Sequence, residues 1–397
     1  MTYTDSLNQS RLSAAVQRIK PSGIRRFFDL ASTMENVISL GVGEPDFVTP
    51  WAVREASIAS LEKGMTSYTA NAGLLELRVA IADYLERKFR TRYSPENEVV
   101  VTVGASEGID LALRATIDPG DEVLIVEPCF VSYAPLVSLI GGIPVSVPTS
   151  LDNDFKVMPK AIESRITERT KGILLSFPNN PTGAVMGEEE LGKIADVVVK
   201  HNLLVYSDEI YAELSYDAPH VSVASLPRMW ERTILISGFS KSFAMTGWRI
   251  GYVTAPEPYA KAMLKIHQYL MMCASTMAQY AALEAVTNCE EEMNEMIISY
   301  RQRRNFFVKS LRETGMECHL PGGAFYAFPS IKATGLTSEQ FAERLLIEEQ
   351  VAVVPGTVFG EGGEGHIRCS YATSMDQLEE AIERIGRFIQ QVAKERK

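Results

Sequence analysis

Residues 233–254 read TILISGFSKSFAMTGWRIGYVT, and this stretch decides how we interpret the chain. Two short apolar runs, Thr233–Ser237 and Ile250–Thr254, enclose a segment of small and aromatic residues. That segment carries Lys241 and, eight residues later, Arg249. Short continuous apolar runs are typical of strands that are buried on both faces of a sheet. The stretch therefore predicts two buried strands with a lysine and an arginine between them.

The same kind of run recurs upstream. Further predicted strands are Val99–Val103, Val123–Val126, Ile143–Val147, Gly172–Phe177 and Leu203–Ser207. Helical stretches separate most of them, at Glu107–Ala115, Tyr133–Leu139 and Glu188–Lys200. Strands that alternate with helices indicate an α/β fold, with a mainly parallel sheet flanked by helices. In such sheets ligands bind at the carboxyl ends of the strands.

A different pattern follows the sheet. Long helices are predicted from Lys261 to Glu313, then short strands at Gly323–Phe328, Val351–Val354 and His366–Ser370, and a final helix from Asp376. A chain of 397 residues is too long for one ordinary core, so we expect a second, smaller α+β domain. The predicted division is 48–288 for the large domain and 289–397 for the small one. Residues 1–47, with a helix at Arg11–Ile19, form an N-terminal segment that joins the small domain.

Composition excludes several classes of protein. A net charge of −11 gives no broad surface for nucleic acid. No apolar run reaches the roughly 18–20 residues of a membrane span, and the polar start, Met1–Ser10, has no signal-peptide core. The five cysteines form no CxxC pair, which predicts reduced, buried thiols in a cytoplasmic protein. The five histidines form no ligand pair, so no metal is expected.

Two small-residue motifs follow predicted strands. Gly104-Ala105-Ser106 stands between a strand and a helix, where backbone N–H groups and the helix dipole could hold an anion. Asn180, in Asn179-Asn180-Pro181-Thr182-Gly183, could donate a hydrogen bond to a cofactor oxygen. Both motifs are also ordinary turn sequences, so neither decides a function alone.

Charged residues follow three other strands. Asp208, in Asp208-Glu209-Ile210-Tyr211, could bind a metal, or could pair with a protonated heteroaromatic nitrogen. Lys241 has a setting that can lower the pKa of an amine and make it nucleophilic, although most lysines are solvated. Arg249 could pair with a phosphate. Arg368 lies in an apolar run and needs a substrate carboxylate or a structural salt bridge. Taken together, the five motifs fit pyridoxal 5'-phosphate (PLP) acting on an amino acid.

From Gly43 to Tyr371 the chain resembles the class I aminotransferases of PLP fold type I. Four motifs carry the resemblance: the whole of Gly238–Gly251, which fits the cofactor-attachment signature, Asn180–Gly183, Asp208-x-x-Tyr211 and Gly43–Phe47.

The resemblance implies a role for each matched residue. Lys241 holds the cofactor covalently and moves the proton of the substrate Cα, with Asp208 and Tyr211 as its catalytic partners. Asp208 pairs with the pyridine nitrogen, Tyr211 and Asn180 with the phenolic oxygen. The phosphate contacts are Gly104, Ala105, Ser106, Ser237, Ser240 and Arg249. Phe130 stacks on the ring. Arg368, helped by Gly43 and Asn180, binds the substrate carboxylate, and Tyr68 reaches the neighbouring subunit of a homodimer with shared active sites.

The amino donor is less constrained. Aspartate-specific relatives place a lysine at Ser106 or an arginine near Met271–Ser275, and neither cation is present. The resemblance therefore favours alanine with 2-oxoglutarate in a ping-pong reaction, unless Arg25 or Arg26 supplies the charge for aspartate. Aromatic and N-acetyl-diaminopimelate donors stay open.

Three other functions compete. A PLP β-lyase acting on C–S bonds would share every residue named above. A PLP-sensing regulator would need a DNA-binding domain, and about 40 residues before the core are too few for one. A nicotinamide-dependent oxidoreductase fails because Gly41-Val42-Gly43 lacks the third glycine, with Asp46 in its place.

Overall fold

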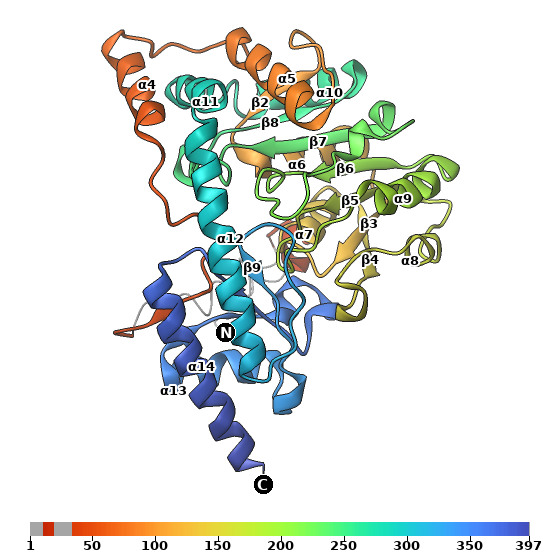
Figure 1. Cartoon of the computed structure of the whole chain (residues 1–397). Helices are drawn as coiled ribbons and strands as arrows, with labels where there is room; N and C mark the ends of the chain where they lie inside the picture. The colour runs from red at the N-terminus through yellow and green to blue at the C-terminus, as the bar shows by residue number, and fades with distance from the viewer. Residues whose placement is uncertain (1–10, 20–33, 397) are drawn as a thin grey trace.

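The computed structural model describes residues 11–19 and 34–396 (Figure 1). Its centre is a seven-stranded sheet in the order β2-β8-β7-β6-β5-β3-β4. Only β8 runs antiparallel to its neighbours. The mixed, mainly parallel sheet predicted from the sequence is confirmed. Its strands are β2 (Val99–Thr102), β3 (Glu122–Glu127), β4 (Ile143–Pro148), β5 (Thr170–Ser176), β6 (Leu204–Asp208), β7 (Thr233–Gly238) and β8 (Gly251–Thr254).

Helices cover both faces of this sheet. Alternate side chains of a strand point to opposite faces, and β3 shows it: Val123 and Ile125 belong to a core with α6 and α10, whereas Leu124 packs with α9. The helices of the large domain are α4 (Trp51–Glu62), α5 (Leu75–Phe89), α6 (Gly104–Thr116), α7 (Tyr133–Leu139), α8 (Pro159–Glu163), α9 (Glu188–Lys200), α10 (Glu257–Leu270) and α11 (Thr276–Asn288). This double covering explains the continuous apolar runs of the strands.

The smaller domain lies beside the sheet and combines short strands with long helices. β1 (Ile38–Ser39) pairs in parallel with β10 (Val351–Ala352). β11 (Val354–Pro355), β12 (Ile367–Ser370) and β9 (Tyr326–Ala327) form an antiparallel sheet. Figure 1 shows α12 (Glu290–Glu313) running from the large domain down to this region, where α13 (Ser338–Glu349) and α14 (Met375–Glu395) also lie.

Several sequence predictions need correction. The N-terminal helix, α2 (Ala14–Arg18), is shorter than Arg11–Ile19. The run Val351–Val354 divides between two different sheets, and only Tyr326–Ala327 of Gly323–Phe328 is a strand. The helices after the sheet begin at Glu257 rather than Lys261, because Pro256 ends the preceding strand region. α4 and α5 precede the strand–helix rhythm and were not predicted. Cys273 is only half-buried, whereas the other four cysteines are buried.

The proposed domain boundary at 288/289 falls between α11 and α12 and stays a prediction. Within residues 11–19 and 34–396, no helix is long and apolar enough to cross a lipid bilayer.

Candidate active site

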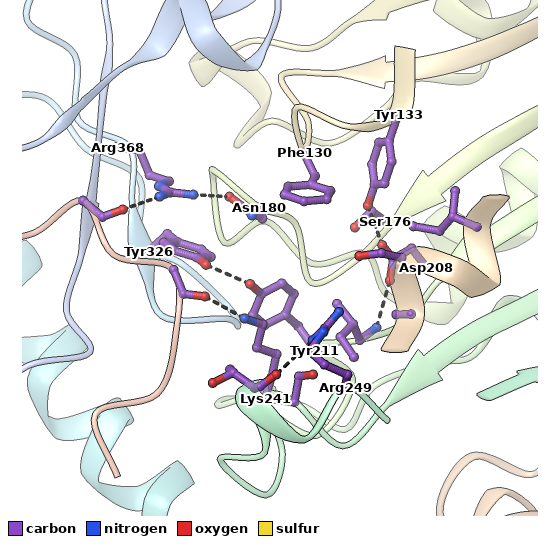
Figure 2. A pocket seen from close by; sticks show the side chains of 18 residues that line it. Phe130, Tyr133, Ser176, Asn180, Asp208, Tyr211, Lys241, Arg249, Tyr326 and Arg368 are labelled. Atoms are coloured by element: carbon purple, nitrogen blue, oxygen red, sulfur yellow. Dashed lines mark hydrogen bonds between the residues drawn. The ribbon is translucent and has the colours of Figure 1, made fainter. Parts of the chain in front are cut away.

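A cavity of about 270 Å³ opens at the carboxyl ends of the strands, between the sheet and the small domain (Figure 2). In this view Arg368 and Asp208 flank the cavity from opposite sides, with Phe130 above and Lys241 below. Its walls bring together most of the residues that the sequence singled out. The lining residues are Gly41, Gly43, Ala105, Ser106, Ile109, Phe130, Tyr133, Ser176, Asn180, Asp208, Ile210, Tyr211, Ser240, Lys241, Thr246, Arg249, Tyr326 and Arg368.

Asp208, at the end of β6, is a buried carboxylate with a partner on each oxygen. The hydroxyl of Tyr133 donates to Oδ2 at 2.6 Å, and the backbone N–H of Ile210 donates to Oδ1 at 3.2 Å. Burial raises the pKa of Asp208 to about 6, and these two hydrogen bonds oppose the rise because they stabilise the ionised form. The carboxylate is therefore held in place and can receive a proton donor from the cavity.

Lys241 follows β7, and its amine lies in the cavity. Nζ donates a 2.6 Å hydrogen bond to the backbone oxygen of Gly43. Burial lowers the pKa of Lys241 to about 8, since a charged ammonium is poorly solvated there. About a tenth of the side chain is thus a neutral amine, the nucleophilic form, at pH 7, and about half at pH 8.

The turn before α6 forms a small cradle beside Arg249. Gly104 has φ +78°, a conformation that favours glycine, and a Cβ built on it would lie 2.7 Å from Nη2 of Arg249. A side chain at this position would therefore displace the guanidinium. Arg249 is fixed in turn by a 2.9 Å hydrogen bond from Nη1 to the oxygen of Thr246. The first N–H groups of α6, including those of Ala105 and Ser106, have no helical acceptor and can bind an anion together with the arginine.

Arg368, in β12 of the small domain, is buried and held on several sides. Nη2 donates to the oxygen of Gly41 at 2.6 Å, and Nη1 donates to Oδ1 of Asn180 at 2.9 Å. The guanidinium lies 4.5 Å from the ring centre of Tyr326 and 4.9 Å from that of Phe359. Its Nε is buried and has no partner in the described chain. Such a planar, oriented and incompletely paired guanidinium can receive a carboxylate.

Aromatic side chains complete the walls. The hydroxyl groups of Tyr211 and Tyr326 lie 2.8 Å apart, which joins the large domain to the small one. Phe130 packs edge-on against Tyr133, with their ring centres 5.7 Å apart. Phe130 therefore presents an apolar surface to the cavity, on which a flat ring could stack.

Three predicted residues do not line the cavity. The hydroxyl of Ser237 turns away and donates to the oxygen of Glu209 at 3.2 Å. Gly104 lies just behind the lining residues, against Arg249. Tyr68 is 80% exposed, so within one chain it serves no part of the site. Its predicted role requires a neighbouring subunit.

The sequence interpretation missed four polar residues of the site: Tyr133, Ser176, Thr246 and Tyr326. Ser176 had a detectable signal, because it is a polar residue at the carboxyl end of an apolar strand. Tyr133 had a weaker one, because it stands three residues after Phe130, at the start of α7. Tyr326 lies in a strand of only two residues, and its position depends on how the domains pack.

These residues fit a phosphorylated pyridine aldehyde. The cavity offers a buried acid, a neutral amine, an anion cradle and an aromatic wall. A metal centre has less support, since no group of three or more potential ligands occurs among the described histidine, cysteine, aspartate and glutamate residues.

Comparison with known proteins agrees with this fit. The family described as "Aminotransferase class I and II" matches residues 35–385. The chain is 63% identical over 380 residues to YugH of Bacillus subtilis (strain 168), whose name gives it as an aminotransferase without a substrate. That alignment covers 96% of this chain and 98% of the relative. An aspartate aminotransferase of Pyrococcus abyssi is 46% identical over 383 residues, covering 96% and 98%.

Solved structures of aminotransferases also resemble this chain. The aromatic aminotransferase of Pyrococcus horikoshii OT3 superimposes with a TM-score of 0.88 at 45% identity, covering 93% of this chain and 99% of that one. Relatives of nearly equal identity thus carry different substrate names, so identity alone does not determine the substrate.

Proposed function

Because the chain belongs to the class I and II aminotransferases, whose members use PLP, we propose that its amino donor is a small neutral amino acid, with alanine first and aspartate as the alternative. The acceptor is a 2-oxo acid such as 2-oxoglutarate. The observation that carries this proposal is the set of cations at the cavity.

Among the described residues that line the cavity, three are cationic: Lys241, Arg249 and Arg368. In the proposed assignment Lys241 holds the cofactor, Arg249 faces its phosphate and Arg368 binds the α-carboxylate. No described lining cation is left for a second carboxylate, whose burial without a partner costs several kcal/mol. Arg25 and Arg26 lie outside the described residues, which keeps aspartate as the alternative.

Residues 271–275 support the same interpretation. This segment reads MMCAS, and Met271 and Met272 are about half exposed on the surface. Met272 is fixed there, because its backbone oxygen accepts a 2.7 Å hydrogen bond from Nδ2 of Asn71. An unbranched thioether adapts to apolar groups and supplies no charge to a carboxylate.

In the reaction, bound PLP supplies an electron-withdrawing ring for the electron pair of the donor Cα–H bond. Arg368 binds the donor carboxylate in a bidentate geometry and so orients the Cα–H bond towards Lys241. Lys241, as a free amine, removes the proton from Cα as a general base. Asp208 keeps the facing ring nitrogen protonated, and the hydroxyl of Tyr211 and the amide of Asn180 donate to the ring oxygen.

The remaining assignments follow the cradle geometry. Ala105, Ser106, Ser240 and Arg249 bind the phosphate, and Gly104 gives the arginine room. Ser237 is assigned a supporting role, because its hydroxyl is directed to Glu209. Phe130 stacks on the ring without adding a polar contact.

A homodimer with shared active sites is part of the proposal. Ten large apolar side chains that are exposed in the single chain support it, since an interface would remove them from water. These are Val48, Trp51, Ile58, Leu61, Met65, Tyr68, Tyr269, Leu270, Met271 and Met272. Sedimentation should give twice the monomer mass, and Tyr68→Phe should weaken cofactor binding while the dimer persists.

The donor is tested with the purified holoenzyme and 2-oxoglutarate, by following glutamate formation for each amino acid. Alanine should exceed aspartate in kcat/KM by at least tenfold. If aspartate is preferred, the argument from missing cations is wrong; if no amino acid yields glutamate, 2-oxoglutarate is not the acceptor. The missing cation disfavours the distal carboxylate of 2-oxoglutarate as well, so pyruvate and oxaloacetate, which differ in that group, are compared as acceptors in the second half-reaction. Pyruvate should be the better of the two.

A β-lyase is the second candidate, because the same lining residues would serve C–S cleavage. Incubation with cystathionine alone separates the two activities. Release of ammonia and a 2-oxo acid, without any added acceptor, would favour the lyase.

A further inference from the structure

A buried glutamate–histidine pair lies directly behind the anion cradle. Nδ1 of His267, in the last turn of α10, lies 2.7 Å from Oε1 of Glu107. His267 is fully buried, and the side chain of Glu107 is 7% exposed. Neither residue lines the cavity, and no step of the proposed reaction uses them.

Glu107 closes the first turn of α6. Its Oε2 accepts a 2.5 Å hydrogen bond from the backbone N–H of Val103, the residue that precedes the helix. Val103 has no capping side chain of its own, so this carboxylate is what fixes the entry to the helix. The cradle residues Gly104, Ala105 and Ser106 lie between the two ends of this bond. Their geometry therefore depends on where the carboxylate of Glu107 is held.

His267 is what holds that carboxylate. A carboxylate only accepts hydrogen bonds, so Nδ1 of His267 must carry the proton that they share. The other ring nitrogen, Nε2, is buried without a partner in the described part of the chain. The side chain thus makes a single polar contact, and that contact is with Glu107.

The backbone of His267 is fixed as well. Its oxygen accepts hydrogen bonds from the N–H groups of Met271 and Met272, at 2.8 and 3.1 Å, where α10 ends. A rigid backbone and a fully enclosed ring leave the imidazole few alternative positions. It can therefore set the position of a partner across the interface between α10 and α6.

We propose that His267 is a positioning residue for the cofactor phosphate, acting through Glu107 on the first turn of α6. The proposal rests on the phosphate site proposed above. Without the imidazole donor, the carboxylate of Glu107 would turn towards the free N–H groups of α6 and compete with the phosphate for them. The hydrogen bond from His267 satisfies the carboxylate and leaves those donors to the phosphate.

The test compares three substitutions of His267. An asparagine amide can reach the position of Nδ1 and keep the bond to Glu107, whereas a glutamine amide extends towards the position of Nε2 and loses it. His267→Leu places no polar group at either ring-nitrogen position. For each protein, the cofactor is removed from the holoenzyme, and the dissociation constants of PLP and of pyridoxal, which lacks the phosphate, are measured by absorbance titration.

Wild type and His267→Asn should prefer PLP to pyridoxal by the same factor. His267→Gln and His267→Leu should lose at least tenfold of that preference, about 1.4 kcal/mol, while their affinity for pyridoxal stays unchanged. The control is Tyr206→Phe, which removes a partly buried 2.6 Å hydrogen bond to Thr116 at the opposite end of α6. That variant should keep the full preference.

The outcomes separate the two proposals. If wild type binds PLP and pyridoxal equally, the proposed phosphate site is wrong. If wild type prefers PLP and His267→Gln keeps that preference, the proposed role of His267 is wrong and the proposed phosphate site is unaffected. If His267→Gln loses the same affinity for PLP and for pyridoxal, the positioning role of His267 is also wrong, because a general disturbance of the fold would explain the loss.

Discussion

The hydroxyl of Tyr133 donates a 2.6 Å hydrogen bond to Oδ2 of Asp208 on the wall of the cavity. Both side chains are buried, so this bond acts where water does not compete for the carboxylate. Tyr133 begins α7, three residues after Phe130, so the same segment that carries the aromatic wall also fixes the acid. The phenol of Tyr133 therefore helps to keep the carboxylate of Asp208 ionised.

Tyr133→Phe should raise the pKa of Asp208 further above about 6, because the ionised form loses a donor. A hydrogen bond to a charged group contributes about 1.5–3 kcal/mol. The acidic limb of the pH profile of kcat/KM for alanine should therefore shift to higher pH by about 1–2 units. Tyr206→Phe, which loses an equally short bond to Thr116 but none to Asp208, should leave the profile unchanged. Coinciding profiles for Tyr133→Phe and wild type would contradict the prediction.

The pKa of Lys241, lowered to about 8 by burial, predicts how fast PLP attaches to the cofactor-free protein. Only the neutral amine attacks the aldehyde, and its fraction rises with pH until the pKa is passed. The attachment rate should increase from pH 6 to about 8 and then level off. With a lysine of the usual pKa of 10.5, the attachment rate would continue to rise up to about that pH. Stopped-flow absorbance gives the rate, and Lys241→Ala should show no covalent attachment at any pH.

Arg368→Lys keeps the positive charge but loses the planar fork and its contacts with two aromatic rings. We expect kcat/KM for alanine to fall at least tenfold while cofactor content stays the same. Alaninamide, which lacks the carboxylate, should react equally with both proteins. A similar loss on both compounds would mean that Arg368 does not bind the carboxylate.

Glu213 predicts a pH-dependent stability. Burial raises its pKa from 4.5 to about 7, Tyr84 donates to its Oε1 at 3.1 Å, and its Oε2 has no described partner. Because the folded state holds this proton more tightly than the unfolded state, stability is lost as pH rises from about 4.5 to about 7 and stays lost above. Glu213→Gln removes the charge and should recover up to about 3 kcal/mol at pH 8.

Thermal unfolding at two pH values checks this prediction. The melting temperature of Glu213→Gln should exceed that of wild type at pH 8 and match it at pH 4.5. A gain of equal size at both pH values would point to improved packing instead of the removal of a buried charge.

The sequence predicted the large sheet because each central strand is buried on both faces and is therefore continuously apolar. The same reasoning could have found α5, whose buried residues Leu77, Ile81, Tyr84 and Leu85 repeat at helical spacing. α4 gave a misleading pattern, because Val53, Ser57 and Ser60 are buried while Trp51, Ile58 and Leu61 are exposed. Its apolar face is directed outward, which fits an interface.

The site was predictable where chemistry follows a strand in sequence, as at Asp208 and Lys241. The residues that were missed make contacts between distant parts of the chain. Tyr326 meets Tyr211 across 115 positions, and His267 meets Glu107 across 160. Strands of two residues, such as β9, also carry no periodicity from which a face could be assigned.

The backbone oxygens of Gly41 and Gly43 accept hydrogen bonds from Arg368 and Lys241. One short segment therefore contacts both the arginine proposed to bind the substrate carboxylate and the lysine proposed to hold the cofactor. A change in the backbone of residues 41–43 would thus move both side chains at once, so the two ends of the site are linked through the main chain.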